Sequence, residues 1–121
     1  MKTIAIIGLT LAVLLVGPVR AGAHAFLERA DPRVGSTVRT SPSVVRLWFT
    51  ERLEPAFSSV RIVNEAGKQV DKGDSQVDSS NTALLRVSVP ALAPGIYKVI
   101  WRVLSVDSHV TEGDFTFRVA P

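Results

Sequence analysis

Apolar residues recur at every second position through much of this 121-residue chain. Successive side chains of a β-strand point to opposite faces, so this period predicts strands with one face in a core and one in solvent. After the first 23 residues, no segment has the 3.6-residue apolar period of an amphipathic helix. A parallel sheet needs crossover helices, so the pattern favours an antiparallel sandwich or barrel. The expected strands are 44–49, 60–62, 84–89, 97–103 and 114–119, with a weakly marked one at 34–38.

Turn signals separate these strands. Asn64–Gly67 and the Pro94-Gly95 pair predict tight turns, and the polar segment 71–81 predicts a loop or a frayed edge. Tyr97 and Trp101 share a face of their strand with two valines, which predicts that both aromatics are core residues.

The first residues have the pattern of a secretory signal. Lys2 precedes an apolar run over 4–16, and Ala21-Gly22-Ala23 offers the small-x-small site of a signal peptidase. This run of about 13 residues is shorter than the roughly 20 that a membrane-spanning helix needs. We therefore expect cleavage of residues 1–23 and an exported domain of residues 24–121, with a retained anchor as the alternative.

Charge and sulfur content narrow the functional classes. Cleavage leaves 12 basic and 11 acidic side chains, and no basic block is interleaved with aromatics, which argues against nucleic-acid binding. The chain has no cysteine, and its one methionine is Met1. A metal site in the exported domain must therefore use histidine, carboxylate or the chain terminus.

Cleavage after Ala23 would make His24 the new N-terminus. Its α-amine and imidazole Nδ1 can then chelate one ion, and both groups lose their protons at little cost near neutral pH. Nitrogen donors combined with oxygen favour Cu(II). The alternative is that His24 only marks the cleavage point and is solvated.

The second candidate is Asp107-Ser108-His109, just after the strongest expected strand. If the segment is extended, the Asp107 carboxylate and the His109 imidazole point to the same side. Together with His24 they form a set of three nitrogens and one oxygen that suits Cu(II). The spacing does not establish that the two ends of the domain meet, and a solvated loop is the alternative.

Glu51, at the end of the 44–49 strand, is a further candidate. It could be an oxygen ligand or an acceptor for an imidazole N–H, and Glu54 could compete for either role. A solvated acid is the alternative. Trp48, nearby, could cover the site or pack against the chain terminus.

These residues resemble the CopC family of periplasmic copper-binding, or copper resistance, proteins. The resemblance covers residues 24–119, and its most specific part is the order of terminal His24, Pro-Gly-x-Tyr-x-Val-x-Trp at 94–101 and Asp-x-His at 107–109. The other matching stretches are 47–51, 92–99, 101–109 and 113–117.

The resemblance implies an immunoglobulin-like Greek-key sandwich or barrel of about seven strands with a Cu(II) site. Its ligands would be the α-amine and imidazole of His24, the imidazole of His109 and the carboxylate of Asp107, with Glu51 as a ligand or near neighbour. Some members carry a Cu(I) site on a methionine-rich loop. Residues 64–76 contain neither methionine nor histidine, which predicts a Cu(II)-only protein.

Three functions follow from this pattern. The leading one is a monomeric protein, not an enzyme, that sequesters or carries Cu(II) in copper tolerance or supply. The resemblance implies an inner-membrane transporter of the CopD type as its partner. The second is a copper redox enzyme similar to the histidine-brace monooxygenases, and the third is a copper-free adhesion or assembly domain.

Overall fold

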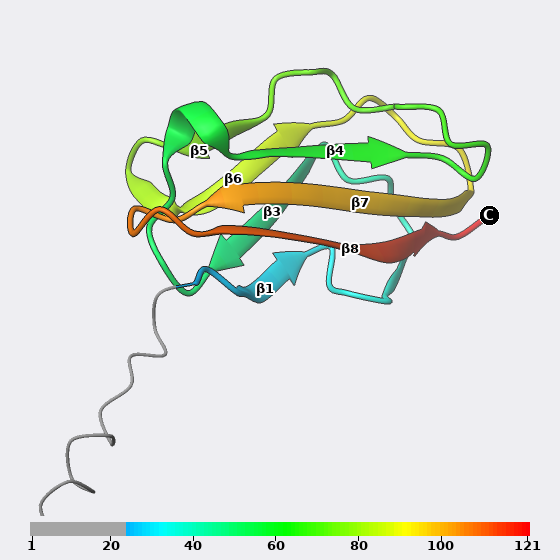
Figure 1. Ribbon diagram of the computed structural model, residues 1–121. Helices are drawn as coiled ribbons and strands as arrows, with labels where there is room; N and C mark the ends of the chain where they lie inside the picture. The colour runs from blue at the N-terminus through cyan, green and yellow to red at the C-terminus, as the bar shows by residue number, and fades with distance from the viewer. Residues whose placement is uncertain (1–23) are drawn as a thin grey trace, which may run out of the picture.

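The computed structural model describes residues 24–121, and the predicted leader 1–23 lies outside the described residues. The described chain forms two packed sheets of four strands each (Figure 1). The elements are β1 (Leu27–Asp31), β2 (Thr37–Val38), β3 (Val44–Phe49), a 3₁₀ turn (Pro55–Phe57), β4 (Ser59–Val63), β5 (Gln76–Asp78), β6 (Asn81–Ser88), β7 (Gly95–Leu104) and β8 (Val110–Val119).

The first sheet has the strand order β1-β3-β6-β5 and the second the order β2-β8-β7-β4. The chain passes from one sheet to the other at every connection except those between β5 and β6 and between β7 and β8, as in a Greek-key sandwich. Every pairing is antiparallel except that of β2 with β8. The predicted all-β antiparallel sandwich is confirmed.

The apolar side chains that recur at every second position form the core. Along β7 the side chains of Tyr97, Val99, Trp101 and Val103 are buried, while the positions between them are exposed or half-buried. Tyr97 donates its hydroxyl to the carbonyl of Ala93 at 2.6 Å, which satisfies its polar end. The prediction that both aromatics of this strand are core residues is confirmed.

Trp101 also sets a requirement on the neighbouring strand. It packs edge-on against Phe49 and crosses β8 at Gly113, where a Cβ would lie 2.5 Å from the indole ring. A glycine at this position is therefore required by close approach of the indole, since any side chain would overlap it.

We expect Gly113→Ala to destabilise the domain by about 1–3 kcal/mol, because the added methyl displaces a packed indole. Urea unfolding followed by circular dichroism measures this change. Thr116→Ala, on the solvent side of the same strand, is the matched control and is expected to cost much less. Equal midpoints for the two variants would contradict this account of Gly113.

The polar segment 71–81 is mostly loop, as predicted, but it contains the three-residue edge strand β5. Asp74 accepts the backbone N–H of Ser88 at 2.8 Å, and Asp78 accepts the N–H and hydroxyl of Ser80. These hydrogen bonds lower the pKa of Asp74 and of Asp78 from the usual carboxyl value. The two carboxylates thus organise the chain around an edge strand that has only one partner, β6.

Candidate metal site

The two histidines lie at one end of the sandwich, although 84 positions separate them in the sequence. At this end the described chain begins, β3 finishes, and the loop from β7 to β8 turns back (Figure 1). The C-terminus is at the other end.

Hydrogen bonds to both sheets fix the segment that carries His24. Ala25 is fully buried, and its carbonyl accepts the hydroxyl of Thr111 in β8 at 2.8 Å. Phe26 and Thr50 form a reciprocal pair: the N–H of Phe26 donates to Oγ1 of Thr50, and the N–H of Thr50 donates to the carbonyl of Phe26, both at 2.9 Å. The first residues of the domain are therefore bonded to both sheets.

The loop that carries His109 is a tight turn. Ser108 donates its N–H to the carbonyl of Ser105 at 2.8 Å, and Ser105 donates its N–H to the carbonyl of His109 at 3.0 Å. The N–H of Val106 reaches the carbonyl of Arg52 at 3.0 Å, which ties the turn to the segment after β3. His109 is thus held at the start of β8 by backbone contacts on two sides.

These two segments place the imidazoles of His24 and His109 together. Their ring centroids are 4.6 Å apart with an interplanar angle of 57°. Both side chains are exposed, so an ion from solvent has access to them. Neutral imidazoles at this spacing can supply two nitrogens to one metal ion after small rotations of the side chains.

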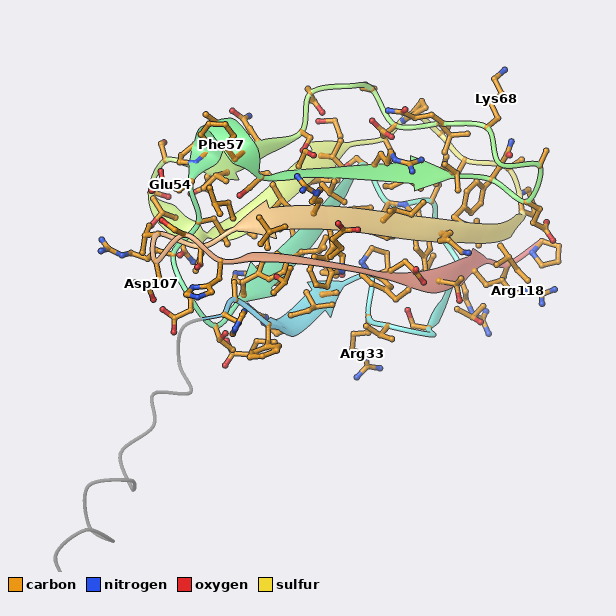
Figure 2. The ribbon with its side chains drawn as sticks, viewed as in Figure 1. Arg33, Glu54, Phe57, Lys68, Asp107 and Arg118 are labelled. Atoms are coloured by element: carbon orange, nitrogen blue, oxygen red, sulfur yellow. The ribbon has the colours of Figure 1, made fainter. Side chains whose placement is uncertain are left out.

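The acidic candidates are less closely gathered. Asp107 is exposed in the turn, Glu51 and Glu54 are half-buried, and Figure 2 shows Asp107 and Glu54 at the same end of the molecule. Within residues 24–121, no three side chains of the histidine and carboxylate types lie close enough together to hold a metal ion. The structure therefore unites two of the four predicted ligands, and the roles of Asp107 and Glu51 stay predictions.

The condition under which Asp107 and His109 would point to the same side is not met. The segment 107–109 is not extended, because Ser108 has a φ of 70°, in the left-handed region. Asp107 and His109 are therefore not related by the alternation of a strand, and the turn decides where the carboxylate lies.

Trp48 lies on the outer face of the first sheet. The guanidinium carbon of Arg29 is 3.7 Å from the centroid of its indole, a cation–π contact across the β1–β3 pair. Of the two roles considered for Trp48, cover for the site or packing against the terminus, neither describes this contact with Arg29.

Sequence reasoning did not single out Ala25, Thr50 and Thr111. No local pattern marks them, because their roles depend on hydrogen bonds between segments 24 and 86 residues apart. They become recognisable only when the strands have been aligned.

The comparison with protein families decides the relationship. The family model for the CopC domain matches residues 27–120, which is most of the chain. The chain belongs to the CopC family. A solved CopC structure from Methylosinus trichosporium OB3b is 40% identical, covers 81% of this chain and 95% of its own, and superposes with a TM-score of 0.72.

Two other relatives of this CopC-family chain are informative. The structure of PcoC from Escherichia coli, described as a methionine-rich copper resistance protein, is 26% identical with a TM-score of 0.70 and covers 79% of this chain and 98% of its own. The copper transport protein CutJ of Bacillus subtilis is 26% identical over 110 residues, which are 90% of this chain. The chain spans only a fifth of the length of CutJ.

The chain departs from PcoC in its sulfur content. PcoC is described as methionine-rich, whereas Met1 is the sole methionine here and lies outside the described domain. Residues 24–121 also contain no helix that is long and apolar enough to cross a membrane.

Proposed function

We propose that the chain is processed after Ala23 and then binds copper as Cu(II) in the periplasm, in order to sequester or carry it. The observation that supports this most is the 4.6 Å approach of the His24 and His109 rings. They are the only two histidines of the chain, and the fold brings both, with exposed side chains, to one end of the sandwich.

The proposed ligands are the α-amine and imidazole of His24, the imidazole of His109 and the carboxylate of Asp107. Glu51 is proposed as an additional oxygen ligand or as a hydrogen-bond acceptor for one of the imidazoles. The soft sulfur ligands that select Cu(I) do not occur in residues 24–121, because these contain neither cysteine nor methionine. A site of nitrogen and oxygen therefore favours Cu(II) over Cu(I).

We propose binding and delivery for this site, and no turnover. The Asp107 carboxylate would occupy a coordination position that oxygen activation needs open. The histidine-brace enzyme would be favoured instead if the reduced copper protein reacted catalytically with oxygen or peroxide.

We further propose that a monomer of this chain exchanges copper with an inner-membrane transporter of the CopD type. The similarity to one fifth of CutJ, a protein named for copper transport, supports a partner of this kind. In CutJ the matching segment is covalently joined to further sequence, because it makes up only a fifth of that protein.

Copper is expected to protect the processed domain from unfolding. At a free Cu(II) concentration 1,000 times the dissociation constant, a ligand that binds only the native state adds about 4 kcal/mol to the free energy of unfolding. Thermal unfolding of the protein that begins at His24, with and without Cu(II), measures this effect. An unchanged midpoint would favour the copper-free domain.

A further inference from the structure

We propose that Thr111 is a positioning residue for copper: its hydroxyl holds the terminal chelate of His24 beside His109. This inference rests on the proposed function. The Thr111 side chain contributes no atom to the proposed ligand set. The observations behind the proposal are one hydrogen bond and the alignment of the two segments that it joins.

The hydrogen bond joins the start of the domain to its last strand. Thr111 Oγ1 donates to the carbonyl of Ala25 at 2.8 Å, across 86 positions of sequence. Thr111 follows His109 by two residues, and Ala25 follows His24 by one. Because Ala25 is fixed against Thr111, His24, the residue before Ala25, lies beside His109, the residue before β8.

The other anchors of this segment act on a different sheet. Thr50 pairs with Phe26 and so attaches the segment to the end of β3, in the first sheet. The pairing of β1 with β3 shifts register between Leu27 and Arg29, a bulge that redirects the chain just after this attachment. His109 directly precedes β8 of the second sheet, so the hydrogen bond from Thr111 links the segment of His24 directly to the strand that follows His109.

Burial makes this anchor rigid. Ala25 is fully buried and Thr111 is half-buried, so the bond is partly shielded from competing water. A terminal residue without such a contact would sample many orientations, and metal binding would have to order it. Holding His24 in place before copper arrives reduces that cost, as the groups that orient metal ligands commonly do.

The test compares variants of the protein that begins at His24, with Cu(II) affinity measured by competition against a chelator. Thr111→Val removes the hydroxyl at nearly constant shape and is expected to weaken binding about tenfold or more. Thr111→Ser keeps the donor and is expected to retain wild-type affinity within about threefold. Thr116→Val, at an exposed position of the same strand, is the matched control and is expected to change nothing.

A second comparison separates positioning from general destabilisation. In a protein extended by one alanine before His24, the terminal amine is already lost as a ligand, so Thr111→Val is expected to cost much less than in the processed form. A purely structural role would give the same loss in both backgrounds. Should the valine variant fail to fold, Thr111→Ala makes the same comparison with a smaller side chain.

Different results would overturn the positioning role of Thr111 and the proposed copper site. If wild-type binding requires the free amine of His24 but Thr111→Val binds equally tightly, the positioning role is wrong and the proposed function stands. If the processed and extended wild-type proteins bind Cu(II) equally, the proposed site itself is wrong. An equal loss in Thr111→Ser and Thr111→Val would also overturn the role of the hydroxyl.

Discussion

Extending the processed protein by one alanine ahead of His24 is expected to weaken Cu(II) binding by more than about 100-fold. The extension converts the terminal amine into an amide, so one nitrogen donor and its chelate ring are lost together. Groups that only orient a metal ligand already change affinity by about 10- to 100-fold, and a ligand that is itself removed should exceed that range. Titration of both proteins against a competing chelator measures the ratio.

The extension leaves the rest of the site undisturbed. The ring contact between His24 and His109 is present in the full chain, where residue 24 is not the terminus. The matched control adds one alanine after Pro121, at the opposite end of the sandwich, and is expected to bind like the processed protein. Equal affinity of the N-terminally extended and processed proteins would exclude the amine as a ligand.

His109→Ala is expected to reduce Cu(II) affinity by a similar factor, more than about 100-fold, because it removes the second imidazole of the pair. His109 is exposed, so its loss should change the free energy of unfolding by no more than about 0.5 kcal/mol. Copper titration and urea unfolding of the same variant separate the two effects.

Two further variants serve as a control and a comparison for His109→Ala. Val110→Ala removes a neighbouring exposed side chain with no donor atom and is expected to leave copper affinity unchanged. Glu51→Ala is expected to weaken binding less than His109→Ala does, because Glu51 is a secondary oxygen ligand or an acceptor in this account. If Glu51→Ala weakened Cu(II) binding more than His109→Ala does, the secondary role given to Glu51 would be wrong.

The strands that the sequence predicts well are those with one clearly buried face. In β3 and β7 buried positions alternate strictly, and the alternation of apolar residues identifies both strands. The weakly marked strand at 34–38 corresponds to β2, Thr37–Val38, which pairs in parallel with β8. The pattern predicts the final strand at 114–119, but the strand begins at Val110, because its first residues alternate between exposed and half-buried positions and carry no alternating apolar signal.

The strands that were missed lack such a face. In β1 only Ala30 is buried, and the register shift between Leu27 and Arg29 interrupts the alternation. In β5 the three residues include only one buried side chain, Val77. Both are edge strands, and their position depends on hydrogen bonds to a neighbouring strand more than on hydrophobic burial.

The candidate site, like the fold, is only partly predictable from the sequence. His24 and His109 are recognisable from the sequence because histidine is scarce in this chain and each one stands beside a second feature, a cleavage site or an acid. Their proximity cannot be recognised from the sequence. It results from Thr111, Thr50 and the turn at Ser108, which connect distant segments. The Asp107–His109 segment is not extended, and the left-handed φ of Ser108 that turns it has no clear signal in a serine.

The most direct test of the account is a crystal structure of the processed protein loaded with Cu(II), with the metal located by anomalous scattering at the copper edge. The account predicts a single copper ion bound by the α-amine and imidazole of His24 and by the imidazole of His109, with Thr111 still bonded to the carbonyl of Ala25. Copper bound elsewhere on the domain, or bound by His109 without the terminal amine, would contradict it.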